Sequence, residues 1–286
     1  MKAIPMSRQT SQKIAFAILT ALAVVVVVPI VLVVAYIIVQ GIGALNWEFL
    51  TTFPRNGMKQ GGILPALVGT VVLTFGTAIV SIPIALGAAV YLAEYAHDTW
   101  MTRAIRLAIV NLAGIPSVVY GLFGLGLFVL FLGLGTSIVA GSLTLGLMTL
   151  PVVISTAEEA LLTVPQRFRV VSRSLGATRW QTVRHVVLPN ALPGILTGII
   201  LGLERAAGET APILFTVAAF YLPQLPRSPL DQTMALPYHL YVISTQVPGM
   251  PLQVQYGTAL VLLVLVLGMN VVATFSRSRF RRRRQW

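Results

Sequence analysis

The sequence predicts an all-α membrane protein with six transmembrane helices and both termini in the cytoplasm. Hydrophobic residues make up 56% of its 286 positions and charged residues only 10%, which is outside the range of soluble globular domains. The apolar residues form runs long enough to cross about 30 Å of hydrocarbon as helices. Most basic residues lie in every second segment between these runs, and this asymmetry indicates the orientation.

Cysteine and histidine offer little chemistry in this chain. There is no cysteine, which excludes a disulfide, a thiolate nucleophile and a cysteine-based metal site. The three histidines, His97, His185 and His239, are far apart and show no metal-ligand spacing. We therefore expect no metal and no cofactor bound by this chain itself.

The first transmembrane helix is predicted at residues 14–45, after a cytoplasmic segment at residues 1–13. Residues 14–39 are uncharged and follow three basic residues. This run exceeds the roughly 7–15-residue apolar core of a signal peptide and lacks a small-residue cleavage site. We interpret it as a retained span, followed by a polar connector at residues 46–60.

Five more spans are predicted within residues 61–275. The second is expected at residues 60–93, with a kink at Pro83. Residues 107–157 carry no charge and are too long for one helix, so they predict spans three and four, joined by a turn at residues 133–136. The last two spans are expected at residues 191–220 and 256–275.

The distribution of basic residues predicts the orientation. With the N-terminus inside, the cytoplasmic segments hold 16 of the 20 basic residues. The outer loops hold Arg55, Lys59 and Arg227, and Arg205 lies within a span. The basic cytoplasmic tail at residues 276–286 is expected to meet anionic membrane lipid, and no nucleic-acid partner is expected.

The charged segment before span five predicts two short amphipathic helices in the cytoplasm. Thr163 with Gln166, and Thr178 with Gln181, have the spacing of capping boxes, and Gly176 separates the two helices. The predicted apolar faces are Phe168, Val171 and Leu175, then Trp180, Val183 and Val187, with polar sides from Arg167, Arg169, Arg173, Arg179 and Arg184. The pair is either a docking element for a partner or a cap on the bundle.

Span five carries three charged residues, Glu204, Arg205 and Glu209. Each ionised group at the centre of a transmembrane helix costs about 2.5–3.5 kcal/mol, so these residues need partners or water. At about 100° per residue, Arg205 and Glu209 share a helix face, while Glu204 points about 140° away from Glu209. We expect them to face protein or a water-filled path; alternatively, the span ends near Leu203 and they lie at its wet end.

Small residues recur at every fourth position of the same span. They are Gly194, Gly198, Gly202 and Ala206. Such a stripe lets the backbone of a second helix approach closely, so we expect it to pack against another span.

The chain lacks the motifs of an ATPase or a hydrolase. A Walker A loop needs a lysine after its last glycine, and none of Lys2, Lys13 and Lys59 stands in that context. The glycine-rich stretch at residues 121–128 lies inside an apolar span and indicates helix packing. No nucleophile, base and orienting acid form a recognisable set, so we expect a chain that is not an enzyme.

The cytoplasmic helix pair resembles the coupling loop of type I ABC importer permeases. Gly176, nine further residues and VVLP at residues 186–189 match the family pattern E-A-A-x3-G-x9-I-x-L-P, although VVS at residues 170–172 replaces E-A-A. The resemblance implies a MetI-like permease fold, with coupling helices at residues 158–189 that insert into an ATPase subunit. The coupling residues that it implies are Arg173, Gly176, Ala177, Leu188 and Pro189.

Two further stretches are similar to the PstA-type membrane subunit of the bacterial high-affinity phosphate importer. They are GIPSVVYGLFGL at residues 114–125 and ERAAGETAPILFT at residues 204–216. The resemblance implies that phosphate passes Arg205 and Glu209, and we add the neighbouring Glu204 to this predicted path. A guanidinium suits a phosphate, and Glu209 is expected to hold it when phosphate is absent.

The same resemblance implies the partners. They are a PstC-type permease subunit, a PstB-type ATPase homodimer that binds ATP and Mg, and a periplasmic or lipid-anchored phosphate-binding protein that delivers inorganic phosphate. The complex is expected in the bacterial cytoplasmic (inner) membrane as a multi-pass assembly.

Three alternatives remain open on the sequence. The first is a permease of the same fold for another oxyanion or nutrient, since fold does not determine substrate. The second is an ATP-independent secondary transporter or channel with a proton relay through Glu204, Arg205 and Glu209; no internal repeat with matching broken helices supports it. The third is an intramembrane sensor whose cytoplasmic loop docks a signalling protein.

Overall fold

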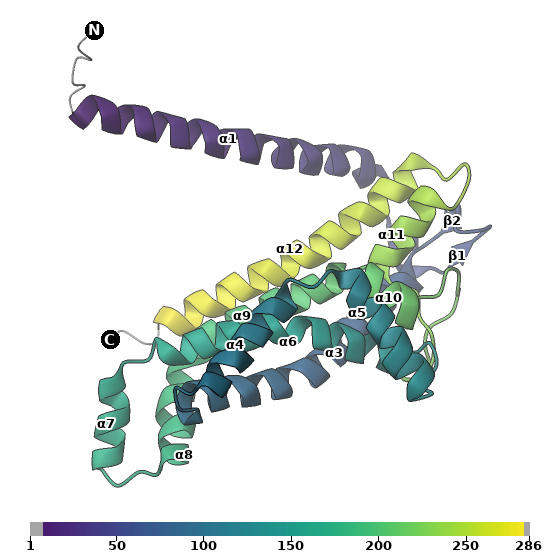
Figure 1. Cartoon of the computed structure of the whole chain (residues 1–286). Coiled ribbons are helices and arrows are strands. Elements are labelled where there is room, and N and C mark those ends of the chain that lie inside the picture. The colour runs from purple at the N-terminus through teal and green to yellow at the C-terminus, as the bar shows by residue number, and fades with distance from the viewer. Residues whose placement is uncertain (1–7, 283–286) are drawn as a thin grey trace.

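The computed structural model describes residues 8–282, most of them helical (Figure 1). The longer helices are α1 (Arg8–Gly41), α3 (Leu64–Val90), α4 (Trp100–Ala113), α6 (Ile138–Leu162), α9 (Leu188–Gly208) and α12 (Leu252–Arg282). The shorter ones are α2 (Trp47–Thr51), α5 (Ser117–Gly124), α7 (Gln166–Ser174), α8 (Arg179–Thr182), α10 (Ala211–Thr216) and α11 (Leu236–Thr245). The predicted N-terminal segment and basic tail lie partly outside the described residues.

Tighter and wider helical turns connect these helices. They are the 3-10 turn η1 (Ile42–Ala44) and the π-helical segments η2 (Tyr91–Tyr95), η3 (Leu125–Phe131) and η4 (Val183–Val187). In the predicted polar connector, α2 is followed by an antiparallel pair of strands, β1 (Pro54–Arg55) and β2 (Gln60–Gly61). Asn46 caps α2, since its side-chain Oδ1 accepts a hydrogen bond from the Phe49 N–H at 2.7 Å.

Within the described residues, five helical stretches are long and apolar enough to cross a membrane, and a bent pair makes a sixth. The five are Gln12–Ala44, Leu64–Tyr95, Ile138–Leu162, Arg179–Gly208 and Leu252–Val272, and the pair is Trp100–Ala113 with Ser117–Phe131. The number of spans therefore agrees with the six predicted.

The third span is not the single continuous helix that was predicted. Its two halves, α4 and α5 with η3, meet at a bend of 100°. The bend lies at Gly114-Ile115-Pro116 because proline has no N–H to continue the helix and disfavours a helical conformation at the residue before it. The predicted turn between spans three and four is present, since η3 ends at Phe131 and α6 begins at Ile138.

The fifth span ends earlier than predicted. It was expected to reach residue 220, but α9 stops at Gly208, and only the short helix α10 follows. Pro212 explains the stop, because a proline ring clashes with the carbonyl four residues earlier, which here belongs to Gly208. The chain therefore leaves the helix at Gly208, one turn after Arg205 and at the first residue of the GETAP sequence.

Helices α3, α6 and α9 form the centre of the bundle, with α6 between the other two. The predicted small-residue stripe of α9 faces α6. A Cβ placed on Gly194 would lie 2.6 Å from the Cβ of Ala160, and one on Gly202 would lie 2.8 Å from Val153 Cγ2. The prediction of close helix approach is therefore confirmed.

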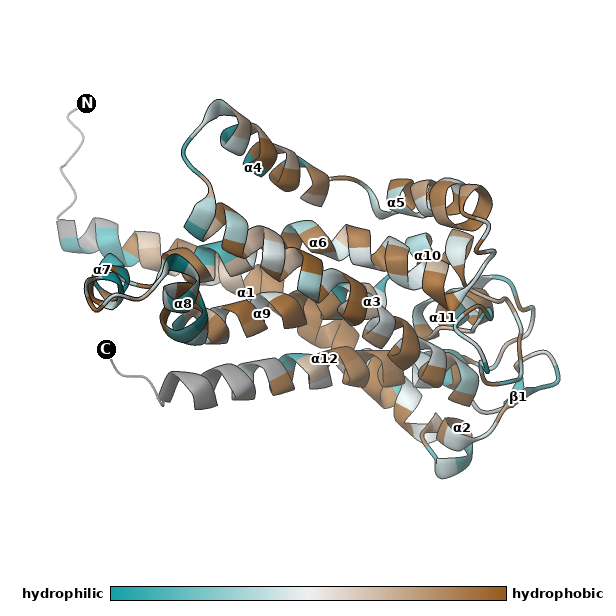
Figure 2. Cartoon of the chain, turned by 90° about the horizontal axis from the view of Figure 1, so that it is seen from below, coloured by the Kyte–Doolittle hydropathy of each residue, from teal (hydrophilic) through white to brown (hydrophobic). Residues whose placement is uncertain are grey.

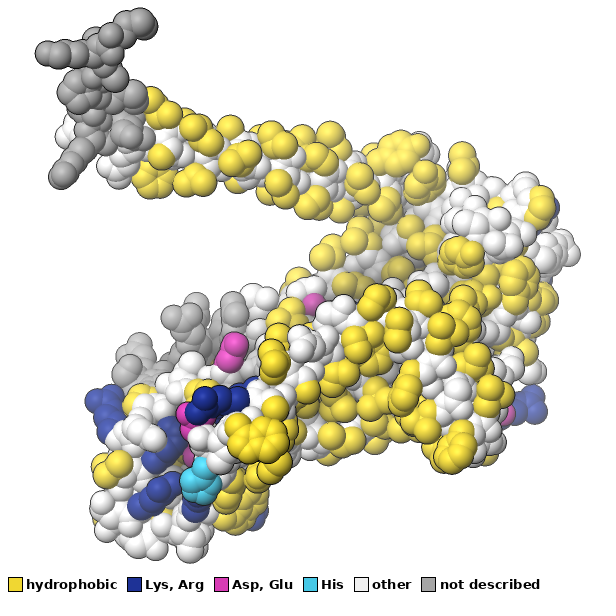
Figure 3. All heavy atoms as spheres, viewed as in Figure 1, with side chains coloured by type: hydrophobic (Ala, Val, Ile, Leu, Met, Phe, Trp, Pro, Cys, Tyr) yellow, Lys and Arg dark blue, Asp and Glu magenta, His cyan; other side chains and the backbone are white. Residues whose placement is uncertain are grey.

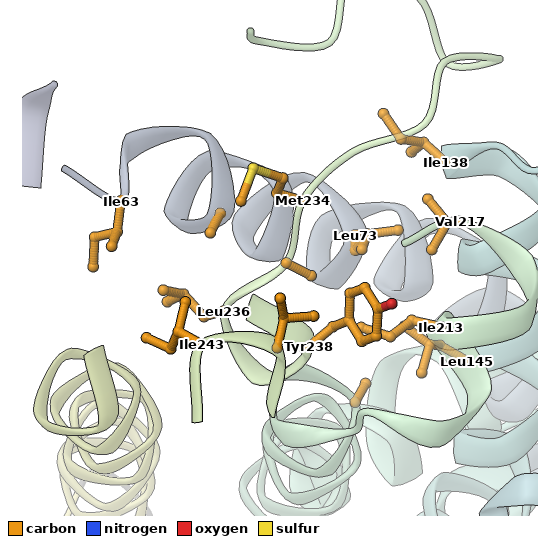
Figure 4. Packing of buried hydrophobic residues seen from close by; sticks show 14 of the residues in the cluster. Ile63, Leu73, Ile138, Leu145, Ile213, Val217, Met234, Leu236, Tyr238 and Ile243 are labelled. Carbon is orange, nitrogen blue, oxygen red and sulfur yellow. The ribbon is translucent and has the colours of Figure 1, made fainter. Parts of the chain in front are cut away.

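Besides the contact between α3, α6 and α9, a cluster of buried side chains lies at the end of the bundle away from α7 and α8. Figure 4 shows Leu73 from α3, Ile213 from α10, and Tyr238 and Ile243 from α11 directed toward one another, with Met234 from the loop before α11. These residues fix α10 and α11 against α3, and thereby fix the chain that follows the break in span five.

The polar side chains gather at one end of the molecule. The beginning of α1, the end of α12 and the helices α7 and α8 all lie at this end (Figure 1), which agrees with the predicted placement of both termini and the helix pair on one side. Figure 2 shows hydrophilic residues over α7 and α8 and hydrophobic residues along α4, α5 and α6. Figure 3 shows Lys and Arg side chains concentrated at the same end.

Helix α1 diverges from the bundle (Figure 1). None of its apolar membrane-length window is buried within the chain. Its contacts are made at its C-terminal end, where the Tyr36 and Tyr256 rings meet edge to face at 5.4 Å between centroids and Gly41 abuts the backbone of Tyr256. The predicted first span is therefore present as a helix, and its apolar surface lies open.

Candidate functional site

Arg205 and Glu209 form an ion pair at the break in span five. Arg205 Nε lies 3.4 Å from Glu209 Oε1, and the two side chains are 37% and 19% exposed. Arg205 is in the last turn of α9, whereas Glu209 has left the helix with an extended conformation (φ −77°, ψ 136°). The pairing that the spacing predicted is present, but it spans the helix end instead of one continuous helix face.

Glu204 lies apart from this pair. Its side chain is buried, with 8% exposure, and the Asn270 side chain of α12 is its polar neighbour. Its Oε1 has no hydrogen-bond partner among the described residues. The structure therefore does not bring Glu204 together with Arg205 and Glu209, because successive residues on a helix face different neighbours.

The two stretches that resemble one importer family lie against each other. Gly121 of α5 is packed so closely on α10 that an added Cβ would lie 3.0 Å from the Ala211 carbonyl oxygen and 2.8 Å from Phe215 Cδ2. Tyr120 donates a hydrogen bond to the Leu112 carbonyl at 2.9 Å. The bend in span three thus supports the break in span five, and both irregularities of the bundle belong to one local structure.

The space beside Glu209 is small within this chain. A cavity of about 10 Å³ is lined by α3, α6, α9 and α10, with Thr70, Thr74 and Glu209 at its polar side. Such a volume holds about one water molecule. Arg205 does not line this cavity, and its side chain is partly exposed, so an ion larger than water reaches it from outside the chain.

The predicted helix pair is present as α7 and α8. The capping box at Thr178 is confirmed: its Oγ1 accepts from the Gln181 N–H at 3.2 Å, and Gln181 Oε1 accepts from the Thr178 N–H at 2.8 Å. The capping box at Thr163 is wrong. Thr163 is the C-cap of α6 instead, and its hydroxyl donates to the Ala160 carbonyl at 2.8 Å.

The predicted apolar faces of this pair are only partly buried. Val183 and Val187 are buried, as expected for the second helix. Several other apolar side chains are exposed at the end of the molecule, namely Val170, Val171, Leu175 and Trp180. The pair therefore presents an apolar surface outward, which a cap folded onto its own bundle would bury.

The five coupling residues implied by the sequence lie in two places. Arg173, Gly176 and Ala177 belong to the end of α7 and the turn that follows it, where Gly176 has φ +88°. Leu188 and Pro189 form the first turn of α9, where the loop joins span five. The glycine turn is explained by its backbone, since positive φ is strained for other residues.

Arg169 corrects the predicted polar sides of the pair. Of the five arginines expected there, Arg167, Arg173, Arg179 and Arg184 are exposed, but Arg169 is buried. Its Nε lies 3.0 Å from Glu94 Oε1 at the end of span two. A buried charge is stable only when it is paired, and the partner here is 75 positions away in the sequence, where no local pattern could indicate it.

Comparison with known proteins identifies the family. The model for "Binding-protein-dependent transport system inner membrane component" matches residues 81–286. The chain is 34% identical to the probable ABC transporter permease protein YqgI of Bacillus subtilis, over 94% of this chain and 95% of that protein. It is 33% identical to the probable phosphate transport system permease protein PstA of Methanocaldococcus jannaschii, over 92% of each.

A third relative is the phosphate transport system permease protein PstA 1 of Mycobacterium tuberculosis, with 35% identity over 92% of this chain and 86% of that protein.

Solved structures with a similar fold are also ABC transporter chains. One belongs to an inward-facing MetNI methionine transporter, with a TM-score of 0.62 and 19% identity over 76% of this chain and 95% of the other. Another belongs to a bacterial transporter involved in import of the polysaccharide alginate, with a TM-score of 0.67 and 13% identity over 96% and 99%. These similarities confirm the predicted MetI-like fold. The chain belongs to the binding-protein-dependent transport system inner membrane components, as an ABC transporter permease of the PstA type.

Proposed function

We propose that this chain is a membrane-spanning permease subunit of an ATP-driven importer of inorganic phosphate in the bacterial cytoplasmic membrane. The observation that carries the proposal is Arg205, a guanidinium held at the break in span five, within the stretch that resembles PstA permeases. The names of the relatives support phosphate as the substrate.

The chemistry of the Arg205–Glu209 pair suits passage of phosphate instead of tight binding. A planar guanidinium donates to two phosphate oxygens at once, and its charge compensates the anion. At 3.4 Å the ion pair with Glu209 is loose, and Arg205 is partly exposed. Phosphate can therefore displace Glu209 on arrival, and the returning carboxylate then helps release the phosphate.

The partners follow from what this chain does not contain. Arg205 faces outward from the chain, so we infer that a PstC-type permease supplies the opposite wall of the path. Lys2, Lys13 and Lys59 stand in no Walker A sequence, so the ATP and Mg are bound by two copies of a PstB-type ATPase. The exposed apolar surface of α7 and α8 is the docking site for that ATPase, and a phosphate-binding protein delivers the substrate to the opposite side.

The direct test is to purify a tagged form of the chain from gently solubilised membranes and identify the proteins that accompany it. We expect a Walker-containing ATPase and a second permease, and we expect the reconstituted complex to take up radiolabelled phosphate only with ATP. Sulfate and molybdate serve as competing oxyanions. Uptake of another oxyanion in preference would reject phosphate as substrate, and ATP-independent transport by this chain alone would reject the importer.

Gly176 provides a test of the docking turn. Nothing lies within 4 Å of a Cβ added to Gly176, but its φ of +88° is unfavourable for other residues, so Gly176→Ala strains only the backbone, by about 1–2 kcal/mol, and displaces α7 relative to α8. We expect less ATPase to co-purify and less phosphate to be transported per ATP. Gly133→Ala is the matched control, because Gly133 has φ +65° and open space but lies in the turn between spans three and four. Equal effects of both variants would contradict a specific role of the docking turn.

A further inference from the structure

Three arginine side chains converge on one turn at the end of span two. The turn is η2, five π-helical residues that extend α3 at the same end of the molecule as α7 and α8. The arginines come from three different elements, namely Arg106 of α4, Arg169 of α7 and Arg179 of α8. This turn is thus the meeting point of the bent third span and both docking helices.

The contact from α7 is a buried ion pair. The Arg169 Nε lies 3.0 and 3.2 Å from the two carboxylate oxygens of Glu94, and the side chains are only 10% and 3% exposed. The same guanidinium donates to the carbonyl oxygens of Leu161, at 2.9 Å, and Val164, at 2.5 Å. Arg169 therefore joins α7 to η2 at the end of span two and to the end of α6.

The contacts from α8 and α4 reach the neighbouring residues of η2. The Arg179 guanidinium lies 4.9 Å from the centre of the Tyr95 ring, a cation–π contact. Arg106 donates to the Leu92 carbonyl at 3.0 Å and pairs with Glu158 of α6.

The backbone at the end of span two accounts for the contact of Arg106 with the Leu92 carbonyl. A helix end leaves carbonyl groups without intrahelical partners, and cations near it interact favourably with them. A π turn is a single wide turn within a helix and frequently marks a functional position. In η2, Leu92 and Glu94 are buried, so their polar groups face the neighbouring helices instead of water.

We propose that η2 is the element through which movement of the docking helices reaches span two, with Glu94 and Arg169 as the positioning pair. The inference rests on the proposed function, because it needs an ATPase that moves α7. The outward side of α7, with Val170, Val171 and Leu175, is open to the ATPase, while Arg169 holds its inward side to the spans. A bidentate buried pair resists sliding, so displacement of α7 pulls η2 and the end of α6 with it.

The pair is tested in the assembled complex with Glu94→Gln, which keeps the size of the side chain and removes its charge. Asp98→Asn is the matched control. Asp98 lies four positions after Glu94 and forms an ion pair with Arg103, which the substitution breaks. The side chains of Asp98 and Arg103 are 74% and 69% exposed. Three quantities are measured for each variant: the ATPase that co-purifies, the phosphate transported per ATP hydrolysed, and the ATP-dependent movement of span two.

The movement can be measured directly because the chain has no native cysteine. Spin labels on Phe75→Cys in α3 and Phe131→Cys in η3, both exposed positions, report the distance between spans two and three. We expect ATP to change this distance in the parent and in Asp98→Asn. In Glu94→Gln we expect the change to be lost while the ATPase stays bound, with phosphate transported per ATP lower by roughly two- to thirty-fold.

The outcomes separate this inference from the proposed function. An unchanged distance response in Glu94→Gln overturns the inference, and so does a loss of transport that only follows loss of the ATPase. If Glu94→Gln fails to assemble, Tyr95→Leu, which removes the contact with Arg179, is measured in its place and is expected to lower the response. A parent complex that moves with ATP but takes up no phosphate rejects the proposed substrate and leaves the inference standing.

Discussion

We expect the Arg205→Gln variant to assemble normally and to lose phosphate uptake by about tenfold or more. The variant removes the charge that would pair with phosphate. Removing one partner of a hydrogen-bonded charge pair costs about 2–5 kcal/mol of binding free energy when the pair is buried. The cost is reduced here because Arg205 is 37% exposed. Glutamine keeps part of the length and hydrogen bonding of arginine but carries no charge, so it tests the charge itself. ATP-driven uptake of radiolabelled phosphate into proteoliposomes measures the effect.

Two further variants complete this experiment. Arg227→Gln removes an exposed arginine from the loop before α11 and is expected to leave uptake unchanged. Glu209→Gln removes the competing carboxylate, so we expect phosphate to bind more tightly and to be released more slowly, which lowers the maximal rate and the half-saturating concentration together. Full uptake by Arg205→Gln would remove Arg205 from the phosphate path.

The second large effect is expected at the helix contact between α9 and α6. A Cβ on Gly198 would overlap the Thr156 side chain, and one on Gly202 would lie 2.8 Å from Val153. Overpacking of a well-packed interior typically costs about 1–3 kcal/mol, and Gly198→Leu adds a whole isobutyl group where even one Cβ overlaps a neighbour. We therefore expect Gly198→Leu to reduce the yield of assembled complex severely, as measured by size-exclusion chromatography and thermal unfolding in detergent.

The matched control for this prediction is Gly268→Leu. Gly268 is also a glycine in a membrane-length helix, α12, but it is exposed and nothing lies within 4 Å of its Cβ position. It is expected to assemble like the parent. A normal yield for Gly198→Leu would show that the contact with Thr156 tolerates expansion and that the small-residue stripe is not required for packing.

Local sequence chemistry predicted several features that the structure confirms. The six spans follow from apolar runs, because a helix satisfies its backbone hydrogen bonds within one segment of the chain and can therefore cross hydrocarbon. The capping box at Thr178, the turn at Gly176 and the pairing of Arg205 with Glu209 each depend on residues within four positions of one another. Short-range geometry of this kind is set by the chain itself.

Other predictions failed where a proline or a distant partner decided the outcome. Pro116 and Pro212 are present in the sequence, but spans three and five were predicted from hydropathy, which stays high across both prolines. Thr163 has the spacing of an N-terminal cap, yet it lies at the C-terminal end of α6, where its hydroxyl donates to the Ala160 carbonyl. The separation of Glu204 from Glu209, by contrast, was expected from about 100° per residue, and only the packing of α9 on α12 placed Asn270 beside it.

Composition and spacings of a few residues were enough to predict the all-α membrane class, the six spans, the basic end of the molecule and the ion pair between Arg205 and Glu209. The burial of Arg169 against Glu94 and the packing of the bend in span three on the break in span five became visible only once the helices were assembled. Contacts between positions far apart in the chain depend on how whole helices pack, and helix packing sums many weak contacts that no local pattern records.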